Sequence, residues 1–295
     1  VRYLLAQTLP YPGRMRAALK LARLVRWMEP ALSRSTIARP LAAMLRLAPQ
    51  RLARSRAPLG AIPEEPAKGR IVLLQGCAEN VLRPEIREAT VRLLSRCGYE
   101  VAFAKREGCC GALTWHLGRE ADGLNSARRN VDAWRGEMAK GLDAIIVTAS
   151  GCGTTIKDYG HMLRDDPVYA DDAARLSDLA LDITEFLSRN GLPPAKVRDI
   201  NVAYLSPCSM QHGQKITGAP VELLRTVGYA VSQPVESHLC CGSAGTYNIL
   251  QSELAGQLGD RKAANLERLS PDVVATGNIG CATQIASRIG APVVH

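Results

Sequence analysis

A repeated cysteine pattern constrains this chain more than any other feature of its sequence. Two cysteine doublets, Cys109-Cys110 and Cys240-Cys241, are each followed by a glycine. A lone cysteine lies 32 positions before each doublet, and a Gly-Cys pair follows each doublet after some 40 positions. The lone and paired cysteines are Cys77, Cys152, Cys208 and Cys281. Recurrence of so specific a side chain at a fixed offset predicts two copies of one folded unit.

The length and the cysteine content indicate an intracellular protein with reduced thiols. A chain of 295 residues can bury a large core and fits two domains. No signal peptide opens the sequence, and no run approaches the roughly 18 apolar residues of a membrane span. We therefore expect a cytoplasmic protein, or one peripheral to the inner face of the membrane. In that compartment, nine cysteines point to metal binding or redox chemistry.

The positive charge is concentrated in a predicted helical arm at the start of the chain. Residues 1–60 contain twelve of the 37 Lys and Arg residues but one of the 28 acidic residues. Apolar and basic residues alternate at helical spacing, and Pro30, Pro40 and Pro49 divide the segment. We expect residues 1–66 to form a basic arm and linker that packs on a partner or on the following domain. A membrane-surface helix is the alternative; nucleic acid is disfavoured because no aromatic platform accompanies the arginines.

Short apolar strands alternate with helical stretches through the rest of the chain. This pattern predicts an α/β fold with two tandem parallel-sheet βαβ (Rossmann-like) cysteine-rich domains, at residues 67–194 and 195–295. The expected strands are 71–74, 99–104 and 143–148, then 202–205, 229–231 and 273–275. The expected helices are 84–97, 119–139 and a stretch from 154 to 190, then 221–227 and 244–269.

Every cysteine of the pattern comes shortly after a predicted strand. The carboxyl ends of parallel strands meet at one edge of a sheet, where ligands bind. We therefore expect the four thiols of each unit to gather there, and the two units to be related by a pseudo-twofold axis. Cys97 lies outside the pattern and is expected in the core. The five histidines, including His212, His238 and the terminal His295, are weak signals.

Four thiolates can hold an iron–sulfur cluster or a structural zinc, and thiol chemistry without a metal is a third option. Zinc sites usually use Cys-x-x-Cys pairs, which are absent here. A cubane 4Fe-4S cluster needs four outside ligands, which matches the count in each unit. The candidate ligands are Cys77, Cys109, Cys110 and Cys152, and Cys208, Cys240, Cys241 and Cys281.

The layout resembles the cysteine-rich CCG domain, found in tandem in heterodisulfide reductases and in iron–sulfur subunits of lactate and glycolate dehydrogenases. It is most similar to the iron–sulfur subunits of glycolate oxidase. The residues that carry this likeness are 129–134 (RNVDAW), 148–153 (TASGCG), 157–160 (KDYG), 237–247 (SHLCCGSAGTY) and 278–281 (NIGC). The heterodisulfide reductase type adds a fifth cysteine to each unit, where this chain has Thr155 and Gln284.

The resemblance implies the non-flavin subunit of an oxidoreductase that acts on glycolate or a similar 2-hydroxy acid. Electrons would pass from FAD on a flavin-containing partner subunit, through iron–sulfur clusters, towards a quinone or another membrane acceptor. A ferredoxin-like cluster region would lie on a missing N-terminal part or on another chain. No Gly-x-Gly-x-x-Gly follows a predicted strand, so no complete active site is expected on this chain. The alternative is a docking module whose cysteine sites hold zinc or are empty.

Overall fold

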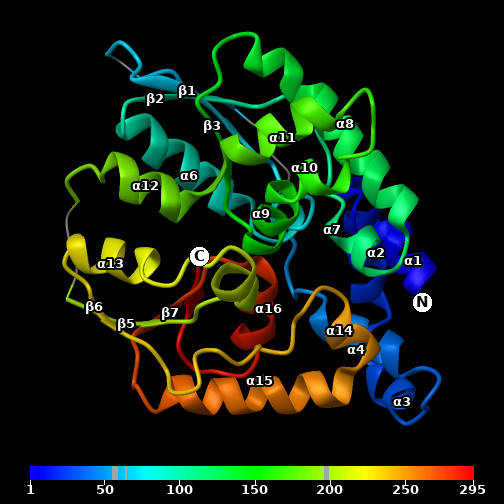
Figure 1. The fold of residues 1–295 in the computed structure, drawn as a ribbon. Helices are drawn as coiled ribbons and strands as arrows, with labels where there is room; N and C mark the ends of the chain where they lie inside the picture. Colours follow the sequence, from blue (N-terminus) through cyan, green and yellow to red (C-terminus); the bar gives the residue numbers. More distant parts are fainter. Residues whose placement is uncertain (55–58, 64, 196–198) are drawn as a thin grey trace.

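The chain folds into two α/β units and an N-terminal helical arm (Figure 1). The structure, a computed structural model, describes residues 1–54, 59–63, 65–195 and 199–295. Residues 55–58 and 64 of the predicted arm and linker, and residues 196–198 of the second predicted domain, lie outside the described residues. We call residues 69–190 unit 1 and residues 201–294 unit 2; the domain boundaries predicted above remain predictions.

Unit 1 is built on a parallel sheet with the strand order β2-β1-β3-β4. Its strands are β1 (Gly69–Leu73), β2 (Tyr99–Ala102), β3 (Ala144–Val147) and β4 (Ala180–Asp182). In the register of the central strands, Ile71 faces Val101 on one side and Ala144 on the other. The residues of β3 are all buried, as expected for a parallel strand covered on both faces.

Alternate residues of these strands pack into two separate cores, one on each face of the sheet. Val72, Ile145 and Val147 contact α8 (Glu120–Met138), α9 (Ser150–Lys157), α10 (Tyr159–Met162) and α11 (Ala170–Leu179). Ile71 and Ile146 contact α6 (Pro84–Arg96) and α12 (Ile183–Asn190) on the other face. The short helices α5 (Glu79–Leu82) and α7 (Ala112–His116) follow the ends of β1 and β2.

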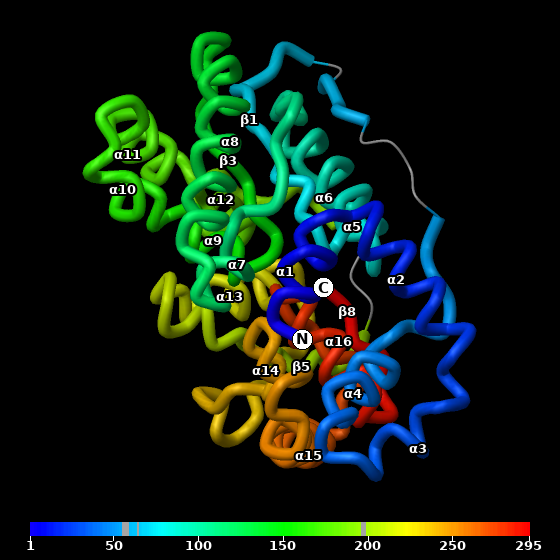
Figure 2. Tube along the Cα trace, turned by 90° about the vertical axis from the view of Figure 1, so that its right-hand side faces the viewer, coloured from blue at the N-terminus to red at the C-terminus, as the bar shows by residue number. Residues whose placement is uncertain are grey.

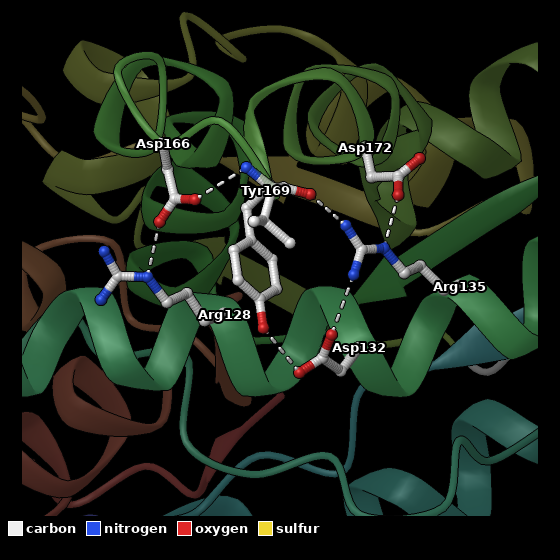
Figure 3. A network of polar contacts seen from close by, with 7 residues as sticks. Arg128, Asp132, Arg135, Asp166, Tyr169 and Asp172 are labelled. Carbon is white, nitrogen blue, oxygen red and sulfur yellow. Dashed lines mark hydrogen bonds and ion pairs between the residues drawn. The ribbon is translucent and has the colours of Figure 1, made fainter.

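A surface network fixes the segment before α11 to the outer side of α8 (Figure 3). Arg128 of α8 pairs with Asp166 at 2.8 Å, and the hydroxyl of Tyr169 donates to Asp132 at 3.0 Å. The Arg135 guanidinium pairs with Asp172 and lies 4.8 Å from the centre of the Tyr169 ring. The pairs are partly exposed, so we expect each to add little stability alone.

Unit 2 repeats the sheet of unit 1 in the order β6-β5-β7-β8. The strands are β5 (Asn201–Tyr204), β6 (Ala230–Ser232), β7 (Val273–Ala275) and β8 (Val293–Val294). The helices are the π-helix η2 (Ser209–Gly213), then α13 (Ala219–Thr226), α14 (Tyr247–Leu250), α15 (Ser252–Glu267) and α16 (Ile279–Ala286). The expectation of two tandem parallel α/β units is confirmed; the pseudo-twofold axis stays a prediction.

The continuous helix expected from 154 to 190 is wrong. That stretch contains α9, α10, α11, the strand β4 and α12. Strand β4 has three residues, and it exists because Ala180 and Leu181 pair with Ile145 and Ile146 of β3. Such an edge strand depends on a tertiary contact and leaves no periodic signal in the sequence. The helical region expected at 244–269 contains two helices, α14 and α15, which meet at Gln251.

The N-terminal arm packs along one side of both units (Figure 2). Its elements are α1 (Arg2–Thr8), α2 (Pro12–Leu24), the 3-10 helix η1 (Arg26–Met28), α3 (Glu29–Ser33) and α4 (Arg39–Leu47). Proline stands in the first turn of α2, α3 and α4, where its missing N–H costs nothing. Helix α2 contacts α5 of unit 1, and α4 contacts α14 and α15 of unit 2. The expected packing on the following domains is confirmed; contact with a partner or membrane stays a prediction.

No helix among the described residues is long and apolar enough to cross a membrane.

Candidate functional site

The four pattern cysteines of unit 1 meet beyond the carboxyl ends of β1, β2 and β3. The sulfur of Cys77 lies 3.6 Å from the sulfur of Cys109. Thiol hydrogen bonds link Cys109 to Cys110, and Cys110 to Cys152. The four sulfurs therefore form one connected group, in the order Cys77, Cys109, Cys110, Cys152.

Unit 2 repeats this arrangement with the same order of contacts. The sulfur of Cys208 lies 4.0 Å from that of Cys240, which contacts Cys241. The Cys241 thiol is in turn hydrogen-bonded to Cys281. The predicted gathering of four thiols at one sheet edge is thus confirmed in both units, and all nine cysteines are free thiols.

A glycine after each doublet allows two neighbouring cysteines to face the same point. Gly111 and Gly242 have φ values of +87° and +86°, which residues other than glycine rarely adopt. Both also lie against a helix backbone: a Cβ would come within 2.9 Å of the Gly123 carbonyl oxygen in unit 1, and within 2.3 Å of the Ala255 carbonyl oxygen in unit 2. The turn also directs the Gly242 N–H onto the sulfur of Cys240, at 3.3 Å.

Contacts with the neighbouring thiols lower the pKa of the first cysteine of each doublet. Hydrogen bonds from Cys110 and Cys77 lower the pKa of Cys109 to about 3. In unit 2, hydrogen bonds from Cys208 and Cys241 lower the pKa of Cys240 to about 2. The donating thiols are shifted the other way, with raised pKa values. Each quartet therefore stabilises a thiolate, which is the form of cysteine that binds metals.

Two buried side chains that the sequence analysis did not assign hold the unit 1 doublet in place. Asn130 is fully buried; its Oδ1 accepts from the Gly108 N–H at 2.9 Å, and its Nδ2 donates to the Cys109 carbonyl at 3.2 Å. The Tyr159 hydroxyl donates to the Cys110 carbonyl at 2.7 Å. Both residues lie in motifs that carry the family likeness, but nothing in the spacing of those motifs revealed this contact.

A cavity of about 260 Å³ leads from Cys77 and Cys109 to the arm, where Pro10, Tyr11 and Pro12 line it. Glu107 also lines it and accepts hydrogen bonds from the Gln75 N–H at 2.8 Å and the Trp134 indole at 3.1 Å. Burial raises the pKa of Glu107 to about 7.

Unit 2 places a lysine where unit 1 has Asn130. Asn130 lies seven positions after Gly123, which packs on Gly111, and Lys262 lies seven positions after Ala255, which packs on Gly242. The Lys262 side chain is buried, and its ammonium donates to the Glu236 carbonyl at 2.6 Å. Burial lowers the pKa of Lys262. The nearby Glu236 carboxylate is held by Arg261 and Asn265.

The residues at the two missing fifth-cysteine positions have other partners. The Thr155 hydroxyl donates to the Gly151 carbonyl at 3.3 Å within its own helix. The Gln284 amide donates to the Ala255 carbonyl at 3.1 Å and accepts from Asn248 at 3.2 Å. Cys97 is buried in the core as expected.

Among the histidines, His212 bonds to the His238 carbonyl at 3.2 Å. His295, which the sequence analysis set aside as terminal, instead contacts unit 1: its Nε2 lies 3.0 Å from the Thr148 carbonyl. Only the fold could reveal this contact, because 147 positions separate the two residues.

Residues next to the cysteines of the two quartets contact each other across the boundary between the units. The hydroxyls of Ser150, two residues before Cys152, and Ser209, directly after Cys208, are 2.7 Å apart. Asn278, three residues before Cys281, donates to the Ser150 hydroxyl at 2.9 Å. The helix N-termini at which Cys152, Cys208 and Cys281 lie thus contact each other.

The donor set of each quartet fits an iron–sulfur cluster. Four thiols, backbone N–H groups near the sulfurs and a glycine turn are the features by which proteins bind such clusters and set their potentials. Among the residues that the structure describes, no group of three or more His, Cys, Asp or Glu surrounds a point that would hold a single metal ion. The sulfurs of Cys77 and Cys109 lie 3.6 Å apart and those of Cys208 and Cys240 lie 4.0 Å apart, so a cluster would require them to separate.

Comparison with known proteins supports this chemistry. The family model of the cysteine-rich domain CCG matches residues 71–157 and 202–286. The glycolate oxidase iron-sulfur subunit of Escherichia coli (strain K12) is 44% identical over 221 residues, which are 75% of this chain and 54% of that protein. The probable glycolate oxidase iron-sulfur subunit of Bacillus subtilis (strain 168) is 29% identical, over 94% of this chain and 64% of that protein. Lactate utilization protein A of Bacillus licheniformis is 29% identical, over 75% of this chain and 92% of that protein. The chain thus spans about half to two thirds of the length of the two glycolate oxidase subunits.

Proposed function

Because the chain belongs to the family of cysteine-rich CCG domain proteins, with one such domain in each unit, we propose that it is an iron–sulfur electron-transfer subunit of a 2-hydroxy-acid dehydrogenase. The observation that carries the proposal is the pair of sulfur quartets, which have the same order of contacts in both units. The relatives named as glycolate oxidase subunits favour glycolate as the substrate of the whole complex.

We propose one 4Fe-4S cluster in each unit. The ligands would be Cys77, Cys109, Cys110 and Cys152 in unit 1, and Cys208, Cys240, Cys241 and Cys281 in unit 2. When bound, such a cluster supplies a one-electron carrier. Thr155 and Gln284 bring no thiolate and are engaged elsewhere, so each unit offers four sulfurs rather than five.

The chain's own residues would position these sulfurs and tune the potentials. Asn130 and Tyr159 hold the backbone of the unit 1 doublet, and the Gly242 N–H donates to a unit 2 sulfur. Hydrogen bonds and positive charge near the sulfurs stabilise the reduced form of a cluster. The contact between Ser150 and Ser209 would keep the two sites adjacent, as transfer of electrons from one to the other requires.

The remaining parts of the reaction would lie on other polypeptide segments. A flavin-containing partner subunit with FAD would take hydride from the 2-hydroxy acid. Ferredoxin-like clusters and a quinone or other membrane acceptor would complete the path, with the complex at the inner face of the membrane. The basic arm, which contacts both units, offers a surface for such an assembly.

Paired substitutions of single cysteines test this proposal. The protein would be purified without oxygen, reduced, and measured by low-temperature electron paramagnetic resonance. Cys110→Ser should remove the signal of unit 1 and Cys241→Ser that of unit 2, while Cys97→Ser, a buried cysteine outside both quartets, should keep both signals. Unchanged spectra in both doublet variants would show that the doublets are not ligands and would favour a docking module.

A further inference from the structure

Arg129 of α8 lies against the backbone of the unit 1 doublet, and the proposed function assigns it no role. Its Nη2 donates to the Cys109 carbonyl at 3.2 Å. The guanidinium also covers Gly108, because a Cβ added there would come within 2.5 Å of the Arg129 Cζ. Gly108 has no positive φ, so glycine is needed at this position for the close approach of the arginine rather than for a turn.

One donor of this arginine has no partner. The Nε atom of Arg129 is buried and forms no hydrogen bond among the described residues. The other arginines of α8, Arg128 and Arg135, each pair with an aspartate, whereas the described part of the chain offers Arg129 no such pair. A guanidinium is always charged, and a buried charged donor without an acceptor costs free energy. The fold therefore keeps an uncompensated positive charge at this place.

The uncompensated charge lies beside two of the proposed cluster ligands. Arg129 lines the cavity of about 260 Å³ together with Cys77 and Cys109. Glu107 lines the same cavity, but its two oxygens accept hydrogen bonds from a backbone N–H and from a tryptophan indole. A cubane cluster with four thiolate ligands is an anion, and it becomes more negative when it is reduced. It would supply the compensating charge that the chain itself does not.

Unit 2 has an arginine at the equivalent position but pairs it with a carboxylate. Arg261 directly precedes Lys262, as Arg129 directly precedes Asn130. The Arg261 Nε donates to Glu236 at 2.8 Å, and its Nη2 pairs with the other carboxylate oxygen. The Arg261 side chain is 60% exposed, so solvent also screens its charge. The same arginine is thus neutralised in unit 2 and left without a counter-charge in unit 1.

The residue before each doublet agrees with this difference. Gly108 in unit 1 leaves room for the guanidinium, whereas Leu239 holds the equivalent position in unit 2. A side chain at that position would overlap an arginine placed as Arg129 is. We therefore expect the doublet of unit 2 to exclude this contact.

We propose that Arg129 places a positive charge and an unpartnered Nε–H donor next to the unit 1 site, and that it raises the reduction potential of the cluster bound there. The inference rests on the proposed function and deepens it, because it names a residue that tunes one of the two clusters. Positive charge near a cluster stabilises its reduced form, which is the more negative one. One charge near a partly buried site changes the equilibrium between the two forms by roughly tenfold.

Redox titration of chains with a single cluster tests the inference. Each substitution would be made in the Cys241→Ser chain, which by the proposed function keeps only the cluster of unit 1. Arg129→Gln should favour the oxidised form about tenfold, which lowers the midpoint potential by about 59 mV for a one-electron couple. Arg129→Lys keeps the charge and should restore at least half of this decrease. An unchanged potential in Arg129→Gln, or an equal decrease in both variants, would overturn the inference.

Gly108→Ala tests the placement of the charge without removing it. The atoms nearest to the added Cβ all belong to the Arg129 guanidinium, so the substitution should displace this flexible end and leave the fold intact. It should lower the unit 1 potential, as Arg129→Gln does. The matched control is Arg261→Gln in the Cys110→Ser chain, where the exposed, paired charge should change the unit 2 equilibrium by less than twofold. No change in Gly108→Ala, or a tenfold change in Arg261→Gln, would contradict the inference.

The titration separates failure of the inference from failure of the proposed function. A Cys241→Ser chain that holds no reducible cluster, with Arg129 in place, would overturn both. A cluster whose potential is the same with and without the Arg129 charge would overturn the inference alone and leave the electron-transfer function standing.

Discussion

The two cysteine quartets share their internal contacts but differ in what surrounds them. In unit 1, the doublet is held by neutral hydrogen bonds from the buried Asn130 and Tyr159. In unit 2, the corresponding helix position carries the buried ammonium of Lys262, next to the pair formed by Glu236 and Arg261. The fold therefore fixes where the thiols lie, whereas the facing helix sets the charge near them. We expect the two sites to differ in stability and in reduction potential.

The largest expected effect comes from substitution of the glycine that follows the cysteine doublet in each unit. Gly111→Ala and Gly242→Ala place a Cβ against a helix carbonyl at a positive φ, so each should lower the free energy of unfolding by about 3 kcal/mol or more. Gly242→Ala should cost more, because its Cβ would lie closer to the carbonyl oxygen. Urea unfolding measures both.

Gly118→Ala is the matched control for these variants. Gly118 also has a positive φ, of +77°, but a Cβ there meets nothing within 4 Å. Its cost should reflect backbone strain alone, about 1 kcal/mol. Equal costs at all three glycines would show that the contact with the helix carbonyl is unimportant.

Asn130→Leu tests the neutral hydrogen bonds that hold the unit 1 doublet. The substitution leaves the buried Gly108 N–H without its partner and removes the bond to the Cys109 carbonyl. We expect a loss of about 2–4 kcal/mol in the free energy of unfolding, together with loss of metal from unit 1 and not from unit 2. Equal loss of metal from both units, seen by electron paramagnetic resonance, would contradict the claim that different residues hold the two sites.

Lys262→Met tests the buried positive charge near the unit 2 sulfurs. It should change mainly the reduction potential of that site. Removal of a buried cation near the sulfurs should lower the reduction potential of the unit 2 site, by on the order of 50 mV. Stability should change by less than about 1 kcal/mol, because an apolar chain of similar length replaces a costly buried charge. A redox titration monitored by electron paramagnetic resonance checks the shift. Lys262→Arg keeps the charge and should show no such decrease; a decrease of equal size there would remove the electrostatic explanation.

The smallest expected effect is the pH dependence of the Glu236 contact. Hydrogen bonds from Arg261 and Asn265 lower the pKa of Glu236 from 4.5 to about 2. A carboxylate with a depressed pKa in the folded state stabilises the fold above pH 4.5, and this contribution is lost as the pH falls towards 2. Thermal melts of Glu236→Gln and wild type should therefore differ slightly at pH 6 and converge at low pH. A difference that persists at pH 2 would assign the effect to packing.

The sequence allowed the prediction of the sheets and the convergence of the thiols because both depend on local patterns. Strands such as residues 71–74 are continuous apolar runs, and the position of each cysteine after a strand places it at the carboxyl edge. Strand β4 could not be predicted, because its three residues pair with β3 but are too few to leave a periodic pattern in the sequence. The roles of Asn130 and Lys262 could not be predicted from the sequence either, because each side chain contacts a backbone group more than twenty positions away.

Iron and acid-labile sulfide per chain, measured on protein purified without oxygen, test the central claim most directly. Two four-thiol sites that each bind a cubane cluster predict about eight iron and about eight sulfide per chain. Cys110→Ser and Cys241→Ser should each reduce both numbers to about four. Protein without sulfide, with one zinc per unit or with no metal at all, would contradict the account.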